Sequence, residues 1–172
     1  MNYLRRVWQT RSSTLWLALI RILVGFEWLR SGWEKVVDPE FAAGLPNTLG
    51  FFASQNPNAW YVTLINNIAL PNVRLFAILV AYGEFLVGLS LLLGLFTYVG
   101  AFFAMVMNAN YFFAASHLSP STYGLNFVLF IVTLILILGG ACKVLSLDQV
   151  LSERVLRFLP WSRLCRAQPD VK

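Results

Sequence analysis

Charged residues are scarce in this sequence. Only 12% of its 172 residues are charged, whereas 58% are hydrophobic, and the mean hydropathy is +0.67. A soluble domain carries about 25% charged residues, so the composition excludes a soluble globular protein. It indicates an integral membrane protein, and the length allows a single domain over residues 1–172.

Basic residues are nearly absent from the middle of the chain. They cluster before the first hydrophobic segment and after the last, and Arg74 is the single one between Val36 and Cys142. The net charge is +5. The placement of the basic residues at the two ends indicates how the chain is oriented in the membrane by the positive-inside rule, and it gives no reason to expect a nucleic-acid partner. We expect the cell (cytoplasmic) membrane, crossed several times, with both termini in the cytoplasm.

Groups that bind metals are also few. The sequence has one histidine, His117, two cysteines, Cys142 and Cys165, and no CxxC or Cys/His spacing. One histidine cannot supply two axial haem ligands, and there is no thiolate cluster for an iron–sulfur centre. We therefore expect no metal site and no intrinsic cofactor. Both cysteines fall on the predicted cytoplasmic side, which predicts free thiols.

Long hydrophobic runs dominate the remainder of the chain. Each is long enough to cross about 30 Å at roughly 1.5 Å per residue. The predicted spans are residues 14–36, 73–95, 98–116 and 123–141. Four spans return the chain to the side from which it started, in agreement with the basic ends. The prediction is an all-α fold, an integral membrane antiparallel four-helix bundle.

Two segments outside the spans also have helical patterns. Residues 38–72 are too long for a plain loop and predict two short outer interfacial helices, the second opened by Asn56 as N-cap and Pro57. The run from Ser146 to Gln149 has the form of a capping box. It predicts a C-terminal amphipathic helix over residues 146–159 on the cytoplasmic surface, with Asp148 on its polar side.

Small and polar residues recur at steps of three and four in the first three spans, so each set lies along one side of its helix. Small residues mark faces where membrane helices approach closely. We call the set in the first span the seam. The seam is Ala18, Arg21, Gly25, Trp28, Gly32 and Lys35; the second set is Ala77, Ala81, Glu84, Gly88 and Leu91; the third is Ala101, Ala104, Asn108, Tyr111 and Ala115.

The charged residues on these faces need partners, because a charge inside a bilayer helix costs about 2.5–3.5 kcal/mol on insertion scales. Depths counted from the outer helix ends predict a pair between Arg21 and Glu84, with Asn108 nearby. The pair could carry function, or could only fix the register of the helices. For Asn108 a structural hydrogen bond is the favoured interpretation, and Trp28 could stack on a quinone ring.

The other charges of the first span have simpler explanations. Arg30 lies three residues from Glu27 and four from Glu34, so local ion pairs can neutralise it. Glu27 is also close enough to the seam to join Glu84, in which case one of the two carboxylates would stay protonated. Lys35 lies near the outer interface and could extend its amine to water.

Four motifs in order resemble the DoxX/DoxD-like family of small four-span membrane proteins. The resemblance covers roughly Leu17 to Leu151. The motifs are Arg21-x3-Gly25-x6-Gly32-x2-Lys35, Gly83-Glu84-x3-Gly88-x2-Leu91-Leu92-x-Gly94-Leu95-Phe96-Thr97, Asn108-Ala-Asn110-Tyr111 continuing to Ser119-Pro120, and Gly139-Gly140-Ala141-x4-Ser146-Leu147-Asp148.

The third motif looks most like the DoxD branch, which is similar to the membrane subunit of thiosulfate:quinone oxidoreductase. The resemblance implies a quinone-linked electron-transfer subunit in the lipid bilayer with a second protein subunit. Candidate catalytic residues are Arg21 and Glu84. Candidates for binding a quinone or an anion are Arg21, Glu27, Trp28, Glu84, Asn108 and Tyr111, and structural roles are expected for Gly25, Gly32, Lys35, Gly88 and Asp148.

A different class of function is a non-catalytic accessory subunit of a larger respiratory or photosynthetic complex. The 15% aromatic content would suit lipid or pigment contacts, and the ion cluster would then be purely structural. A small transporter fits less well, because no span is clearly broken and no inverted repeat is visible.

Overall fold

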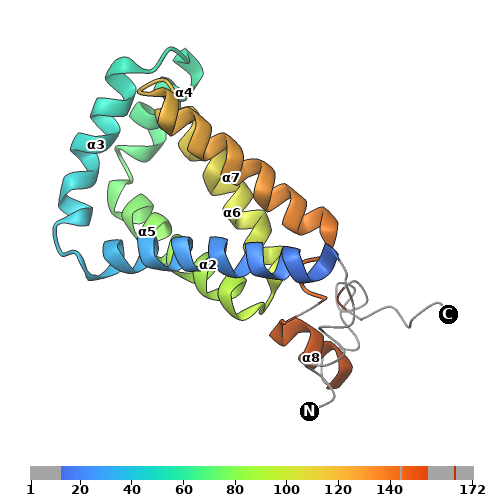
Figure 1. Ribbon diagram of the computed structural model, residues 1–172. Helices are drawn as coiled ribbons and strands as arrows, with labels where there is room; N and C mark the ends of the chain where they lie inside the picture. The colour runs from blue at the N-terminus through green and yellow to red at the C-terminus, as the bar shows by residue number, and fades with distance from the viewer. Residues whose placement is uncertain (1–12, 144, 155–164, 166–172) are drawn as a thin grey trace.

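Every regular element in the described part of the chain is a helix (Figure 1). The computed structural model describes residues 13–143, 145–154 and 165. The long helices are α2 (Ser13–Val37), α5 (Val73–Leu93), α6 (Thr97–Ala115) and α7 (Pro120–Gly139). The short ones are α3 (Phe41–Gln55), α4 (Ala59–Leu64), the π-helical turn η1 (Ile65–Ala69) and α8 (Leu147–Arg154).

The all-α prediction is confirmed, and the long helices end within about three residues of the predicted segments, which is close to the usual scatter of helix boundaries. Three of them, α5, α6 and α7, are long and apolar enough to cross a membrane. The fourth, α2, has 25 residues but carries five charged ones and is not among those three. Residues 155–159 of the predicted last helix, and the basic residues before Ser13, lie outside the described residues.

Helix α7 leaves most of its apolar surface exposed. Only 17% of its most apolar stretch is buried inside the molecule. Exposed apolar faces of this length are what a helix presents to lipid. The exposed side chains include Leu125, Val128, Ile135 and Leu138.

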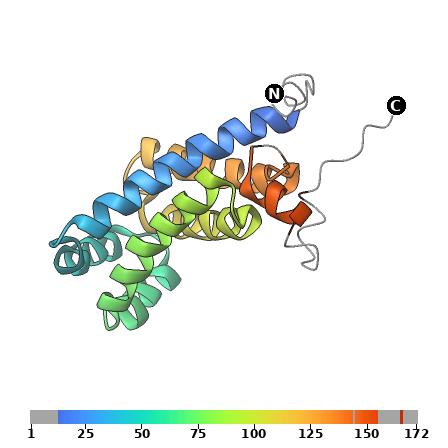
Figure 2. The same cartoon turned by 90° about the horizontal axis from the view of Figure 1, so that it is seen from below.

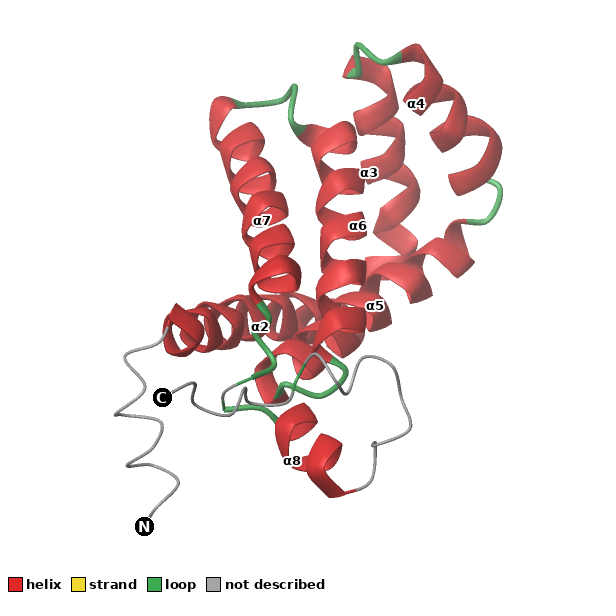
Figure 3. Ribbon diagram, turned by 90° about the vertical axis from the view of Figure 1, so that its right-hand side faces the viewer, coloured by secondary structure: helices red, strands yellow, loops and turns green. Residues whose placement is uncertain are grey.

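The long helices form two pairs. Figures 1 and 2 show α2 lying along α5 in the opposite chain direction, and α6 lies against α7 in the same way. The two helices of each pair are therefore antiparallel. The pairs themselves cross, because Figure 3 shows α6 and α7 side by side while α2 runs across them near their lower ends.

The α2–α5 pair is held backbone to backbone by glycines. A Cβ atom added to Gly25 would lie 2.5 Å from the nitrogen of Leu92, and one added to Gly32 would lie 2.6 Å from the Cα of Phe85. Gly88 is equally tight against Leu29 of α2. Residues without a side chain permit this close approach of two helix backbones.

The predicted faces are the buried ones. On the seam, Ala18, Arg21, Gly25, Trp28 and Gly32 are buried and Lys35 is half-buried. All five residues of the second set are buried, as are three of the third set, in which Tyr111 and Ala115 are half-buried. The core between the pairs is made of apolar side chains from α2, α5, α6 and α7, mostly alanine, valine and leucine together with the indole of Trp28.

The segment between α2 and α5 folds into α3, α4 and η1, which we call the cap. Tyr61 and Ile65 of the cap bury themselves against Ala114 near the end of α6. Asn56 does not serve as the predicted N-cap. Its amide donates to the carbonyl oxygen of Phe113 at 2.7 Å and its Oδ1 accepts from the nitrogen of Asn58 at 2.9 Å. The side chain is thus occupied by α6 and a local turn, and Asn58 precedes α4.

Candidate functional site

A buried carboxylate on α5 is the centre of the polar cluster. Glu84 is 2% exposed and lies where α5 faces both α2 and α6. Its Oε2 is 2.6 Å from the Nζ of Lys35, and its Oε1 accepts a hydrogen bond from the hydroxyl of Tyr111. The two oxygens therefore connect the amine of α2 to the phenol of α6.

Lys35 reaches the carboxylate instead of extending to water as the sequence suggested. Its amine also donates to the Oγ of Ser31 at 2.7 Å, which fixes the direction of its long side chain. The side chain of Lys35 is 26% exposed, against 3% for Glu84. The ion pair thus has one end near the surface and the other end buried.

The ring of Tyr111 is also one of a pair of stacked aromatic rings. The indole of Trp28 stacks on the ring of Tyr111, with centroids 6.3 Å apart and planes inclined by 20°. Trp28 is 6% exposed and Asn108, one turn from Tyr111 on α6, is 1% exposed. In the described part of the chain neither the Nε1 of Trp28 nor the Nδ2 of Asn108 has a hydrogen-bond partner.

Arg21 does not pair with Glu84, so this prediction is wrong. Its guanidinium is fully buried beside Gly94, just past the end of α5, and its Nη2 donates to the carbonyl oxygen of Leu145 at 2.6 Å. Gly94 follows Glu84 by ten residues, about 15 Å along a helix. The glycine contacts set this register, and they place Lys35, not Arg21, opposite the carboxylate.

The remaining charges of α2 form the predicted local pairs. Arg30 lies 3.3 Å from Glu27 and 3.4 Å from Glu34. All three side chains are well exposed, so the structure does not bring Glu27 to the carboxylate of Glu84. Exposed pairs of this kind contribute little to stability.

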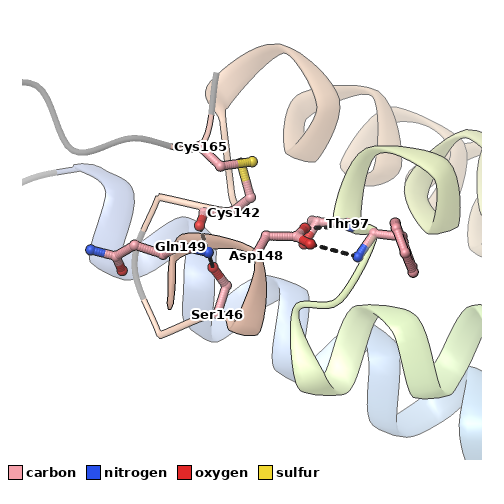
Figure 4. The surroundings of a disulfide bond; sticks show 7 residues. Thr97, Cys142, Ser146, Asp148, Gln149 and Cys165 are labelled. Carbon is pink, nitrogen blue, oxygen red and sulfur yellow. Dashed lines mark hydrogen bonds between the residues drawn. A yellow bond between two sulfur atoms is a disulfide. The ribbon is translucent and has the colours of Figure 1, made fainter. Parts of the chain in front are cut away.

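A second polar junction joins the turn between α5 and α6 to α8; we call it the clamp (Figure 4). Gly94 and Phe96 both have left-handed backbone angles there. The carboxylate of Asp148 accepts hydrogen bonds from the nitrogens of Phe96 and Thr97, each at 2.7 Å, and the nitrogen of Asp148 donates to Gly94 at 2.9 Å. Asp148 therefore caps α6 across the fold.

Asp148 was predicted on the polar side of a helix at the membrane surface, but its side chain is buried, with 4% of its surface exposed. The capping box itself is half confirmed, since the Oγ of Ser146 accepts from the nitrogen of Gln149 at 3.1 Å. The hydrogen bonds of the Asp148 carboxylate explain why it is buried. A carboxylate that satisfies two free N–H groups at a helix start is stabilised there by the helix dipole.

The cysteines are not free thiols, so that prediction is also wrong. Cys142 and Cys165 form a disulfide with Cα atoms 5.2 Å apart, next to the clamp (Figure 4). Both are buried, at 0% and 1% exposed. A disulfide is unusual in a reducing cytosol, so this pairing is at odds with the cytoplasmic location that the basic residues predict for the same end.

Residues 16–160 match the family described as TQO small subunit DoxD. The chain belongs to the DoxD family. No curated protein and no solved structure matches it. The DoxD match covers the long helices, the cap and α8, so Glu84, its two partners and the clamp all lie within the family region. A membrane protein that serves as a small subunit is what the family description supports.

Proposed function

We propose that this DoxD-family chain is the membrane subunit that brings a quinone to a thiosulfate-oxidising partner. Its family describes a small subunit, which supports a larger protein beside it. Thiosulfate oxidation would take place with that partner. The chain described here would supply the site in the bilayer where the quinone head group is held while it is reduced.

The observation that carries the proposal is the pair of unpartnered donors beside the stacked rings. A buried N–H group without an acceptor costs about 1–3 kcal/mol, so such groups normally meet a ligand or an ordered water. Quinones have two carbonyl oxygens, which accept hydrogen bonds, and a flat ring. The Nε1 of Trp28 and the Nδ2 of Asn108 supply donors, and the ring of Tyr111 supplies a surface for stacking.

Arg21 fits an anion better than a quinone, because its Nε and Nη1 are buried and unpartnered within the described residues. However, Asp148 lies close enough to interact with it electrostatically. The carboxylate already opposes the positive charge, which weakens the case for a second anion. We therefore assign the quinone to the Trp28 side and give Arg21 a structural role at the clamp.

Binding is tested with the purified full-length chain in lipid nanodiscs, by quenching of tryptophan fluorescence with a short-chain ubiquinone. Asn108→Leu keeps the side-chain volume and removes the donor. We expect about a tenfold higher Kd, the loss of one hydrogen bond of about 1.4 kcal/mol. Trp28→Phe should weaken binding as well, and Trp33→Phe, at a ring that is 54% exposed, is the matched control.

An unchanged Kd in both Asn108→Leu and Trp28→Phe would overturn the assignment of the site. Absence of saturable quinone binding to the unmodified chain would overturn the proposed function. Extraction in a gentle detergent followed by mass spectrometry then addresses the accessory-subunit alternative, which predicts stoichiometric recovery with a large complex and no bound quinone.

We further propose that the protein resides in the cytoplasmic membrane with α2 as a fourth span and both termini in the cytoplasm, on the distribution of basic residues. The disulfide favours the opposite orientation. An impermeant thiol reagent applied to sealed cells, on a variant that carries one cysteine in place of Gly44 in the cap, decides between them. Labelling places the cap outside, and protection until lysis places it in the cytoplasm.

A further inference from the structure

We propose that Lys35, Glu84 and Tyr111 form the route by which protons reach the bound quinone, and that protons enter at the end of the bundle where α2 meets α3. The inference rests on the proposed function and adds to it the path and the direction of proton uptake. It also assigns a role to Lys35 that a register-fixing ion pair would not require.

The three groups make an unbroken chain of hydrogen bonds through the interface of three helices. The amine of Lys35 is bonded to one oxygen of Glu84, and the hydroxyl of Tyr111 is bonded to the other. The carboxylate is buried, whereas the lysine side chain is 26% exposed near the end of α2. Lys35 lies two residues before the end of α2 at Val37, so we place this end of the chain at the membrane surface, and the other end is the residue whose ring stacks on Trp28.

A purely structural role explains this arrangement poorly. Burying an ion pair is costly, and apolar replacements of similar volume are often as stable or more stable. The backbone contacts of Gly25, Gly32 and Gly88 already fix how α2 and α5 fit together. The second oxygen of Glu84 would not need a phenol from a third helix to hold that register.

The chemistry of the reaction requires such a route. Reducing a quinone to a quinol adds two electrons and two protons, and the electrons come from two thiosulfate ions that join through a new S–S bond. Thiosulfate releases no protons in this step, so both must come from water. In each transfer the O–H bond of Tyr111 breaks as a new O–H bond forms on the quinone oxygen. Glu84 then passes to the phenolate a proton received from Lys35, and Lys35 recovers one from water.

Few other charges face the carboxylate. Lys35 from α2 and Tyr111 from α6 are the titratable groups bonded to Glu84 within the described residues. Glu27, Arg30 and Glu34 belong to the exposed ion pairs of α2, and none of them is bonded to Glu84 within the described residues. Arg21 lies at the clamp, about ten residues away along α5. The path from the α2–α3 end is thus distinct from any path through the clamp.

The test uses the complete complex with its thiosulfate-oxidising partner in membranes, with thiosulfate as donor and a short-chain ubiquinone as acceptor. We expect Glu84→Gln and Tyr111→Phe to lower kcat by about 100-fold, the usual contribution of a positioned proton donor. The quinone Kd should change less than about twofold in these variants, since neither removes the stacking ring or the unpartnered donors. Glu34→Gln and Tyr123→Phe, at exposed sites, are the matched controls.

Loss of folding is separated from loss of proton transfer by the double variant Lys35→Met with Glu84→Met. It removes both charges together, so that no charged group is left unpaired, and the hydroxyl of Tyr111 loses its acceptor as a neutral group. We expect it to bind quinone with the Kd of the unmodified protein and to show the same loss of kcat. Normal kcat in this variant would overturn the relay while leaving the quinone site intact.

The direction of uptake is measured in sealed vesicles with a pH-sensitive dye on one side, after protease access has shown which end of the protein faces out. Alkalinisation on the side of the α2–α3 end during turnover is the expected result. Alkalinisation on the side of α8 would overturn the route. A failure of quinone to bind at all would instead count against the proposed function, so the two failures can be told apart.

Discussion

The contact at Gly32 links the packing of two helices to the ion pair at the candidate site. Its α-carbon faces the backbone of Phe85, the residue after Glu84, and Lys35 lies one turn further along α2. Replacing Gly32 with alanine adds one methyl group at the point of closest approach. Since the atoms opposite belong to backbone, no flexible side chain can move aside.

The distance from the added Cβ atom to the backbone of Phe85 gives the expected loss of stability. The added Cβ would lie 2.6 Å from the Cα of Phe85, whereas ordinary contacts begin at 3.4 Å. The helices must therefore separate locally by at least about 0.8 Å, and the distance from Lys35 to Glu84 would grow to about 3.4 Å, beyond a normal hydrogen bond. Overpacking of this kind costs about 3 kcal/mol at the upper end of its range.

The assay is thermal unfolding in detergent followed by circular dichroism, together with quinone turnover. Gly32→Ala should lower Tm by roughly 6–12 °C, from about 2–4 °C per kcal/mol in a chain of this size. The control is Gly124→Ala on α7, where an added Cβ meets nothing within 4 Å. The control should be neutral or slightly more stable, since alanine favours a helix. A Tm for Gly32→Ala equal to that of the control would refute the backbone contact.

Three other predictions concern the clamp, the cap and the disulfide. Asp148→Ala leaves two N–H groups at the start of α6 without an acceptor and should lower stability by about 2 kcal/mol, measured by thermal unfolding against Glu34→Ala. Burial raises the pKa of Tyr61 to about 12. Because burial favours the neutral form of Tyr61 in the folded cap, its contribution to the free energy of unfolding is complete below about pH 10 and is lost as pH rises toward 12. Tyr61→Phe should remove this fall in stability with pH. Reducing the bond between Cys142 and Cys165 should cost about 3 kcal/mol from chain entropy, and a Tm unaffected by dithiothreitol would contradict this.

Periodicity in the sequence was sufficient to find the buried faces. Steps of three and four along α2, α5 and α6 identified Trp28, Glu84 and Asn108 as inward-facing, because the helix repeat does not depend on neighbouring helices. The hydrophobic run lengths found the long helices for the same reason. These features are local, and local sequence determines them.

The pairing of charges was not local and was predicted wrongly. Depths counted from helix ends assume that the helices start level with one another, whereas α2 and α5 are aligned by their glycines. Gly25 faces Leu92 and Gly32 faces Phe85, an antiparallel register that brings Lys35 to Glu84. The glycines of the two helices indicate the register better than depth does, since close backbone contacts leave the helices little freedom to slide.

The clamp and the disulfide lay beyond what spacing could predict. Asp148 is separated from Thr97 by 51 positions, and the cysteines by 23. An aspartate at the start of a helix is usually explained by that helix itself, and two cysteines carry no pattern that shows whether they meet. Both contacts depend on how the end of α7 returns to the turn after α5, which is a property of the assembled fold.

The cap that Asp148 provides also has a consequence for synthesis. The start of α6 receives its two acceptors from a residue that is 51 positions later in the chain. At about 5–20 residues per second, the ribosome needs roughly 3–10 s to make the intervening segment. During that interval the nascent α6 has a polar, uncapped start, and only the arrival of α8 completes it. The last described helix to be translated is thus the one that closes the turn between the two helix pairs.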